Sequence, residues 1–390
     1  MHFFVCSRPN TPSRMENSDL FYKVLFCMLP GCGPKTGQQL LEAFGPPEEI
    51  LANNGALLAG HPELPPRLAE GARSSQLRKR ALCEVDFILK KAICPIWITD
   101  KAYPYRLKEC ADAPLLLYQW GATLPEQEKV IAVVGTRRAS RHGSESCHNL
   151  ITGLASMGFR FSVVSGLASG IDTVAHAAAL SCGMPTYAIL ATGLNTIYPS
   201  GNRSLARKLT ETGALLTEFA SSDPFAKANF VRRNRIIAGL ADAIIVVESG
   251  IKGGAMRTAA MAHSYNRELF AVPGRPADYY SKGCNLLIKN EMARLIESAE
   301  DLAVALNWDL TASKADATEQ TLPFAQTPPD YKALSPDEQA TLILFDTQRT
   351  LHIDQINELL GFPVQKTAAL LMQLVIKGWL KSMPGQSYQL

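Results

Sequence analysis

The chain has 390 residues, of which 47% are hydrophobic and 19% charged, and its formal net charge is +3. This length exceeds one ordinary hydrophobic core and predicts two or three domains, while the apolar content excludes global disorder. The near balance of charge excludes a general basic coat, so a nucleic-acid site has to be a local concentration of Lys and Arg. Nine scattered cysteines without CxxC spacing argue against a disulfide framework or a zinc site.

The first 90 residues predict a short tail, 1–18, followed by a helical domain, 19–90. Apolar residues recur at helical spacing from residue 19 onward. A Pro-Gly-x-Gly-Pro turn at 30–34 fits a helix–hairpin–helix or SAM-like domain, whose backbone N–H groups can hold a DNA phosphate, or a plain tight turn between packed helices. No apolar run approaches the roughly 20 residues of a membrane span. With free thiols that suit a reducing compartment, we expect a cytoplasmic protein without membrane contact.

Residues 91–308 show short apolar runs that alternate with helical patterns. Continuous Val/Ile runs between helices predict a mostly parallel sheet covered on both faces, which is an extended Rossmann-like α/β fold. In such sheets, ligands bind beyond the carboxyl ends of the strands. The runs are CPIWIT (94–99), VIAVVG (130–135), RFSVVSG (160–166), TYAILATG (186–193), ALLTEF (214–219), AIIVVES (243–249) and ELFAVPG (268–274).

The last 80 residues predict a linker and a small C-terminal domain. Residues 309–332 lose periodicity and gain Thr, Ala, Gln and Pro, as is typical of a linker. Residues 333–390 begin with a capping box, Ser335 to Glu338, and continue as two helices and a hairpin, which predicts a winged-helix (DML1-like) domain. Its candidate recognition helix holds Lys366 and Lys377 but no Arg, so it fits a protein contact or a weak auxiliary DNA role.

Glycines follow three strands, and two of these segments are glycine-rich strand-to-helix turns that could bind an anion. Backbone amides at helix starts, together with the helix dipole, favour phosphate at such a sheet edge. Neither a P-loop nor a dinucleotide fingerprint is present, so no nucleotide cofactor is predicted, and no metal cluster is apparent. The candidate binding residues of these turns are Gly135, Thr136, Arg137, Ser165, Gly166, Gly170, Gly253, Gly254 and Arg257.

The segment KANFVRRNR, residues 227–235, combines cations with one aromatic ring. Cations neutralise phosphates while a base stacks on the ring, a combination that suits single-stranded nucleic acid. The alternative is a solvated helix start with the ring in the core. Asp172 and His176 lie four residues apart on one helix face. This spacing fits a general acid/base pair or, alternatively, a side-chain hydrogen bond that braces the helix. The candidate binding residues of the segment are Lys227, Asn229, Phe230, Arg233, Asn234 and Arg235.

Several motifs together resemble the DprA/Smf family of DNA-processing proteins. The resemblance covers about 180 residues in the order of that family, and the flanking modules match its common layout. The motifs are VGTR (134–137), SGLASGIDTVAH (165–176), YPSGN (198–202), TEF (217–219), FVRRNRIIAGL (230–240), VVES (246–249) and AVPG…GCNLLI (271–288).

This resemblance implies a protein that binds single-stranded DNA without catalysis, protects incoming DNA in natural transformation and helps to load the RecA recombinase. The family's pocket arginine falls on Arg137, and its pocket lysine and stacking phenylalanine fall on Lys227 and Phe230. The family also forms homodimers through the end of the core domain, here within residues 270–300. The turn GGAMRT, 253–258, departs from the usual SGSLIT-like form and adds Arg257.

Two other functions stay open at this point. A GG-x-x-x-T turn is similar to that of nucleotide phosphoribohydrolases of the lysine-decarboxylase-like type, with Glu218 and Glu248 as acids in the crevice. A regulator that binds duplex DNA through the winged helix is the other alternative.

Overall fold

The structure is a computed structural model that describes residues 18–125, 129–308, 335–347, 350–377, 379–383 and 387–389. The chain divides into two compact units, Met1–Glu319 and Gln320–Leu390. The predicted linker, and the predicted tail apart from Ser18, lie outside the described residues. The fold class expected from the sequence is confirmed in both units, which are described separately below.

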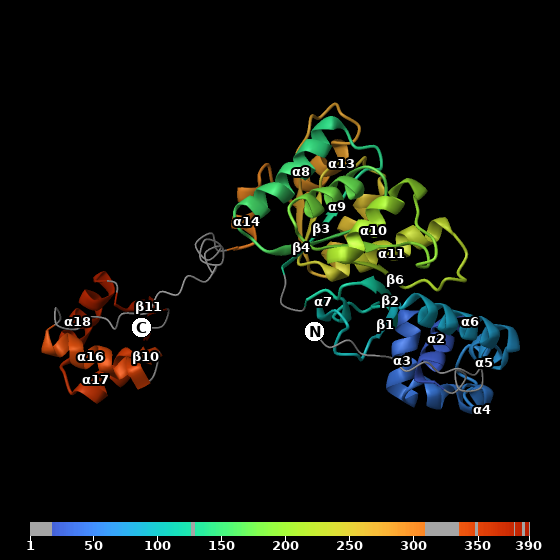
Figure 1. Cartoon of the computed structure of the whole chain (residues 1–390), viewed down its shortest axis with the longest axis horizontal. Coiled ribbons are helices and arrows are strands. Elements are labelled where there is room, and N and C mark those ends of the chain that lie inside the picture. Colours follow the sequence, from blue (N-terminus) through green and yellow to red (C-terminus); the bar gives the residue numbers. More distant parts are fainter. Residues whose placement is uncertain are drawn as a thin grey trace. The chain divides into compact units, whose positions relative to one another are not determined.

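The first unit opens with helices, as the periodicity predicts (Figure 1). Ser18 caps the first helix by accepting a hydrogen bond from Phe21 N at 3.2 Å. The Pro-Gly-x-Gly-Pro segment is a tight turn in which Gly31 has φ +88° and leaves no room for a Cβ beside Arg67. The helices are α2 (Asp19–Met28), α3 (Pro34–Phe44), α4 (Pro47–Ala59, kinked at 52–55), α5 (Pro66–Arg73) and α6 (Ser75–Lys91).

A nine-stranded sheet forms the centre of this unit, in the order β1-β2-β6-β5-β4-β3-β7-β8-β9. The strands from β6 to β9 in that order pair in parallel, while β2 pairs antiparallel with both β1 and β6. Of the nine strands, β2, with six residues, and β9, with two, were not predicted. The strands are β1 (Cys94–Trp97), β2 (Leu116–Gly121), β3 (Lys129–Val134), β4 (Phe161–Ser165), β5 (Thr186–Ile189), β6 (Ala214–Thr217), β7 (Ala243–Val246), β8 (Glu268–Ala271) and β9 (Arg294–Leu295).

Helices cover both faces of the sheet, which explains the continuous apolar runs. Along β3, Ile131 and Val133 pack with the helices of one face, while Val130 and Ala132 pack with those of the other. α8 (Arg141–Ser156), α9 (Ile171–Ser181) and α14 (Ala299–Ala305) cover the first face; α11 (Lys227–Leu240), α12 (Gly254–Ser264) and α13 (Lys282–Lys289) cover the second. The remaining elements are α7 (Tyr105–Lys108), η1 (Ser200–Asn202) and α10 (Arg203–Thr212).

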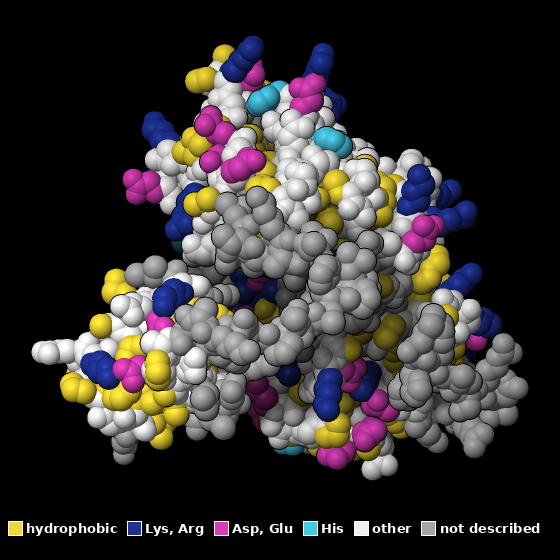
Figure 2. Space-filling model, turned by 60° about the vertical axis from the view of Figure 1, so that its left-hand side comes forward, with side chains coloured by type: hydrophobic (Ala, Val, Ile, Leu, Met, Phe, Trp, Pro, Cys, Tyr) yellow, Lys and Arg dark blue, Asp and Glu magenta, His cyan; other side chains and the backbone are white. Residues whose placement is uncertain are grey.

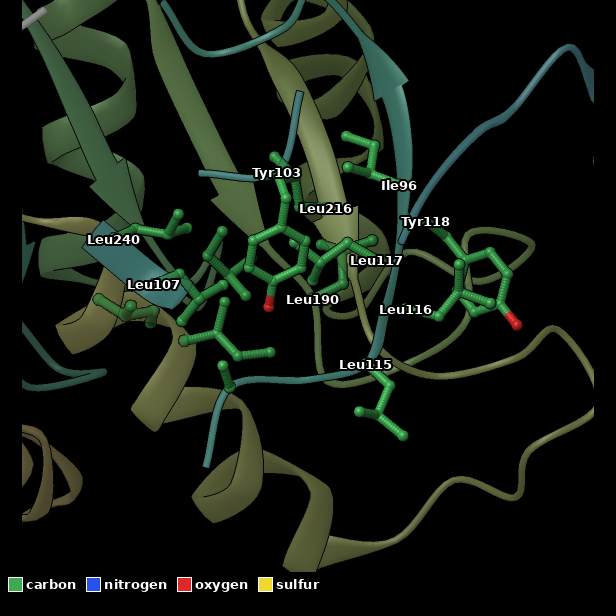
Figure 3. Packing of buried hydrophobic residues seen from close by; sticks show 14 of the residues in the cluster. Ile96, Tyr103, Leu107, Leu115, Leu116, Leu117, Tyr118, Leu190, Leu216 and Leu240 are labelled. Carbon is green, nitrogen blue, oxygen red and sulfur yellow. The ribbon is translucent and has the colours of Figure 1, made fainter. Parts of the chain in front are cut away.

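The antiparallel pair β1–β2 joins the N-terminal helices to the sheet. Phe26 of α2 meets Trp97 of β1 edge to face, with ring centroids 6.4 Å apart. Figure 3 shows Tyr103 packed among buried leucines that come from α7, β2, β6 and α11 and from the residue that follows β5. Its hydroxyl donates to Pro114 O at 2.6 Å, so the polar atom of this buried ring is satisfied. One continuous hydrophobic cluster therefore runs from the helical segment into the sheet.

The chain reverses its direction of strand addition at β3, which creates the crevice of the fold. Strands β4, β5 and β6 are added on one side of β3, and β7 and β8 on the other. Ligands of such sheets bind at this topological switch point, beyond the carboxyl ends of the strands. Here the loops that follow β3 and β7 meet, because Thr136 N donates to Glu248 O at 2.8 Å.

The second unit has the predicted winged-helix order of helices and strands. The capping box is present, since Ser335 N donates to Glu338 Oε2 at 2.9 Å and Glu338 N donates to Ser335 Oγ at 3.3 Å. Its elements are α16 (Pro336–Thr347), β10 (Thr350–His352), α17 (Ile353–Leu360), α18 (Val364–Ile376), β11 (Lys381–Met383) and β12 (Ser387–Gln389), with the strands in the order β10-β12-β11.

Charged side chains are intermixed on the visible surface, where Lys and Arg alternate with Asp and Glu without a continuous basic coat (Figure 2). This agrees with the small net charge. Within the described ranges, no helix combines the length and the apolar content that crossing a membrane requires.

His176 is fully buried on α9. Its Nδ1 lies 2.6 Å from Thr186 Oγ1, and the Thr186 hydroxyl donates to Val163 O at 3.0 Å, so Nδ1 is the donor to Thr186. This bond replaces the pairing with Asp172 that the spacing suggested. Burial, assisted by the positive charge of Arg233, lowers the pKa of His176 to about 3.

We expect this histidine to make folding less stable in mild acid. Below its ordinary pKa of about 6.5, the unfolded chain binds a proton that the folded chain does not, which costs about 1.4 kcal/mol per pH unit. Stability from this group is therefore complete above pH 6.5 and is lost as the pH falls toward 3. Urea unfolding at about pH 7.5 and pH 5 checks this. The stability gap between wild type and His176→Asn should shrink by about 2 kcal/mol on acidification. An equal gap at both pH values would contradict a neutral buried imidazole.

Candidate nucleic-acid interface

A pocket of about 450 Å³ opens at the switch point, between the loops that follow β3 and β7. Its walls come from those two loops, the segment from the end of β4 into α9, residues 230–237 of α11, the first turn of α12, and the loop between β8 and α13. It contains many of the residues expected from the sequence together with several that were not. The polar and aromatic residues that line it are Thr136, Arg137, Asp172, Phe230, Arg233, Asn234, Ser249, Lys252, Arg257, Thr258, Tyr279 and Tyr280, and glycines 135, 250, 253 and 254 complete it.

Arg137 is held at the pocket by a close approach of two backbones. Gly170 has φ +80°, and a Cβ there would overlap the backbone of Thr136 and Arg137. Ile171 N, at the start of α9, donates to Thr136 O at 3.2 Å. Gly170 therefore serves to fix the loop that carries Arg137 and is not itself part of the pocket lining.

The mouth of the pocket is cationic. Arg137, Lys252 and Arg257 are exposed and line it. Within the described ranges, none of the three forms an ion pair with a carboxylate, so their charge is available to an anion. The N-terminus of α12 points its first N–H groups to the same place, with Gly253 as N-cap and open space beside Gly254. Charge and backbone together suit a phosphate.

An aromatic cluster adjoins the cationic mouth. The Arg137 guanidinium lies over the Phe230 ring, 4.9 Å from its centroid. Tyr198 and Phe225 contact Phe230 with ring centroids 5.6 Å and 5.8 Å away. Phe230 is half-buried, which decides against the alternative that its ring belongs wholly to the core.

Arg233 is buried at the floor of the pocket and fixes α11 on the sheet. Its Nη1 donates to Ile189 O at 2.7 Å, and a Cβ at Gly166 would overlap the guanidinium. Burial lowers the pKa of Arg233 to about 10, against the opposing charge of Asp172, so it remains a cation at neutral pH. Burial likewise raises the pKa of Asp172, while the Arg233 charge and the Ala168 N–H oppose that rise.

The structure corrects the placement of Arg235. It was expected to add charge to the pocket, but its side chain is 9% exposed and pairs with Glu218 Oε2 at 2.6 Å. Arg232 reaches the same oxygen at 3.3 Å. Successive residues of a helix point about 100° apart, so the run Arg232 to Arg235 divides between the solvent, the core and the pocket, and Asn234 is the member beside Arg233 that lines the pocket.

Four other expected residues also lie outside the pocket lining. Ser165 is buried, and its hydroxyl donates to Val133 O at 2.6 Å, which fastens β4 to β3. Gly166 makes room for the Arg233 guanidinium and does not line the pocket. Asn229 is buried and donates to Pro224 O at 3.2 Å. Lys227 is exposed at the start of α11, in the turn before Phe230.

The loop between β8 and α13 supplies a wall that the sequence did not indicate. Tyr279 and Tyr280 line the pocket from this loop, and Ser249 N donates to Tyr280 O at 2.6 Å. Lys252 was missed as well. Lys252 was detectable as a cation inside a glycine turn, whereas the two tyrosines belong to no recognisable motif.

Glu218 and Glu248, the acids considered for a phosphoribohydrolase, lie outside the pocket lining. Glu218 forms the ion pairs with Arg232 and Arg235. Glu248 accepts hydrogen bonds from the backbone N–H and the hydroxyl of Ser140, and its carboxylate lies where a Cβ at Gly143 would be. Neither lines the pocket, where the described carboxylate is Asp172.

Comparison with known proteins identifies relatives of this chain by sequence and by fold. A model described as DNA recombination-mediator protein A matches residues 95–307, and one described as DprA winged helix domain matches residues 325–386. The chain is 40% identical to DNA processing protein DprA of Streptococcus pneumoniae over 205 residues, which cover 53% of this chain and 71% of that protein. It is 34% identical to Protein Smf of Escherichia coli over 293 residues, 73% of this chain and 74% of that protein.

Two solved structures share the fold. Streptococcus pneumoniae DNA processing protein A superposes with a TM-score of 0.58 at 31% identity, covering 74% of this chain and 97% of that one. Helicobacter pylori DNA processing protein A superposes with a TM-score of 0.50 at 28% identity, covering 55% and 95%. The family model spans more than half of the chain, and its match contains the switch-point pocket with its cations. The chain therefore belongs to the DNA recombination-mediator protein A (DprA/Smf) family.

Proposed function

We propose that this protein binds single-stranded DNA at the switch-point pocket, without catalysis. The observation that carries the proposal is the Arg137 guanidinium lying 4.9 Å over Phe230 at a mouth that also holds Lys252 and Arg257. Cations beside an exposed aromatic cluster suit phosphates and unpaired bases on the same strand. A solved relative from Helicobacter pylori is described by its single-stranded DNA binding mode, which supports the same ligand here.

We further propose that the bound strand is incoming DNA in natural transformation, which the protein protects and passes to the RecA recombinase in the cytoplasm. The family's description as a recombination mediator supports this role. The proposal includes a homodimer through residues 270–300. In support, β9 is an edge strand of the sheet, its own Leu295 is exposed, and Met292 is exposed just before it.

A phosphoribohydrolase is the less favoured alternative. Its chemistry needs acids at the nucleotide, and Glu218 and Glu248 are engaged away from the pocket by Arg235 and Ser140. Release of free base from nucleoside monophosphates would nevertheless reinstate an enzyme.

A duplex-DNA regulator is also less favoured. The two lysines of the candidate recognition helix are committed within the winged-helix unit, since Lys366 pairs with Asp337 at 2.7 Å and Lys377 pairs with Glu338 at 2.6 Å. They are therefore less available to a duplex than free cations would be. Loss of oligo-dT binding on deleting residues 309–390 would count in favour of the winged helix as the DNA-binding part.

Binding to oligo-dT at several salt concentrations tests the proposed pocket. We expect Arg137→Ala to weaken binding about tenfold or more and to lower the slope of log K against log salt by about 0.7 per lost phosphate contact. Lys227→Ala should act in the same direction. All sequences should be affected alike, because phosphate contacts carry no base information. If the wild-type protein leaves oligo-dT unbound at low salt, or prefers duplex of the same length, the proposal is wrong.

The variants Arg235→Ala and Arg137→Ala should separate an effect on the free energy of unfolding from an effect on DNA affinity. Arg235→Ala leaves the buried Glu218 carboxylate without its closest partner, which should reduce the free energy of unfolding by about 3–5 kcal/mol. Arg137→Ala removes an exposed side chain and should change it by less than about 0.5 kcal/mol. Urea unfolding of both variants, beside their oligo-dT affinities, provides the comparison. A stable Arg235→Ala protein that no longer binds DNA would place Arg235 at the interface instead.

A further inference from the structure

Three aromatic rings from three separate segments meet beside the pocket and form what we call the aromatic patch. They are Tyr198, from the loop between β5 and η1, Phe225, from the loop before α11, and Phe230, on α11. The ring centroids of Tyr198 and Phe225 are 5.0 Å apart, and each lies within 6 Å of Phe230. Of these, Tyr198 is 44% and Phe225 is 55% exposed. Exposed rings that touch one another next to a cationic pocket are a surface that water solvates poorly and a ligand could cover.

The two exposed rings are carried by loops that hydrogen bonds hold in place. Asn202 Nδ2 donates to Leu167 O and Thr173 Oγ1, both at 2.9 Å, just after Tyr198. Asn195 Nδ2 donates to Ser221 O at 2.9 Å, which ties the loop of Tyr198 to the loop of Phe225. The buried Asn229 donates to Pro224 O, directly before Phe225. Rings on braced loops lose little conformational freedom when a ligand stacks on them.

The packing of Phe230 points to its two neighbours as the accessible stacking surface. Arg137 covers one face of the Phe230 ring, and Tyr198 and Phe225 meet that ring at interplanar angles of 70° and 75°. Phe230 is half-buried in consequence. The larger exposed areas belong to Tyr198 and Phe225, which extend the patch outward from the pocket.

We propose that Tyr198 and Phe225 form a second base-stacking site, which takes the bases of nucleotides next to the one whose phosphate occupies the pocket. This inference rests on the proposed function and adds the course of the strand, out of the pocket past Phe230 and onto the patch. Aromatic rings beside a cationic groove bind successive bases with little regard to sequence, because every base has a π face. Lys227, which lies in sequence between Phe225 and Phe230 and is exposed, supplies a cation for the phosphates along this course.

The test uses the full-length protein, an oligo-dT strand and an abasic strand of the same length, which keeps the phosphates and lacks the bases. The double variant Tyr198→Leu/Phe225→Leu removes the rings but keeps apolar side chains. The variant Tyr198→Phe/Phe225→Tyr keeps both rings. Trp120→Leu is the matched control, since Trp120 of β2 is a 46% exposed aromatic that pairs with Leu215 near the start of β6, at the opposite end of the parallel strands from the pocket.

For the leucine double variant we expect roughly 5- to 150-fold weaker binding of oligo-dT, as the loss of one stacked base predicts. Its binding of the abasic strand and its salt slope should equal those of the wild type, because the phosphate contacts remain. The ring-keeping variant and Trp120→Leu should bind both strands as the wild type does.

Three results would overturn the inference. Leucine variants that bind oligo-dT within twofold of the wild type would show that the patch contacts no base. An equal loss on the dT and abasic strands would show that the rings support the fold of the loops. A loss in the ring-keeping variant equal to that in the leucine variant would exclude stacking as the cause. In each case Arg137→Ala still reports on the pocket: if it weakens binding, the proposed function stands although the second stacking site fails.

Discussion

The guanidinium of Arg233 occupies the space beside Gly166 where any other residue would place a Cβ. From there it donates to Ile189 O, on the central part of the sheet, and faces the buried Asp172. A charge this deep is tolerated only when it is paired and hydrogen-bonded. It fixes the rotation of α11, and that rotation decides which neighbours reach the pocket. Phe230 and Asn234, one turn apart, face the pocket because Arg233 and Arg235 are directed into the protein.

The packing around the glycines shows which of them make room for a neighbouring group and which leave space for a ligand. Glycines in the sequence indicate where a strand ends and the chain turns into a helix. Helices do begin after two of these turns, at Ile171 and at Gly254. The role of each glycine depends on which atoms lie where its Cβ would be, and these atoms come from parts of the chain that the local sequence does not reveal. Gly166 faces Arg233 and Gly170 faces the Thr136–Arg137 backbone, whereas Gly254 faces open space. A glycine turn therefore predicted the edge of the sheet correctly but did not distinguish packing from ligand contact.

Other features escaped prediction for the same reason, namely that long-range contacts create them. The parallel strands are apolar on both faces and were recognisable as runs, but β2 pairs antiparallel with β1 and β6 and has no regular neighbouring helix to mark it. The run from Arg232 to Arg235 reads as a uniform cationic stripe, yet Glu218, fourteen to seventeen residues earlier, engages two of its members. Tyr279 lines the pocket from a loop that is tied to the end of β7 by the hydrogen bond from Ser249 N to Tyr280 O.

The contact of Arg137 with the Phe230 ring positions a cation that can still bind a phosphate. A carboxylate partner would also hold the guanidinium, but it would compete with the anion and would have to be displaced, with a desolvation cost to each group. An aromatic face attracts the cation through its quadrupole and leaves the guanidinium N–H donors, which lie in the plane of the group, directed outward. At 4.9 Å from the Phe230 centroid, Arg137 is positioned without being neutralised. The ring that orients the cation thus also begins the aromatic patch, so the elements that would hold a phosphate and a base are set by one contact.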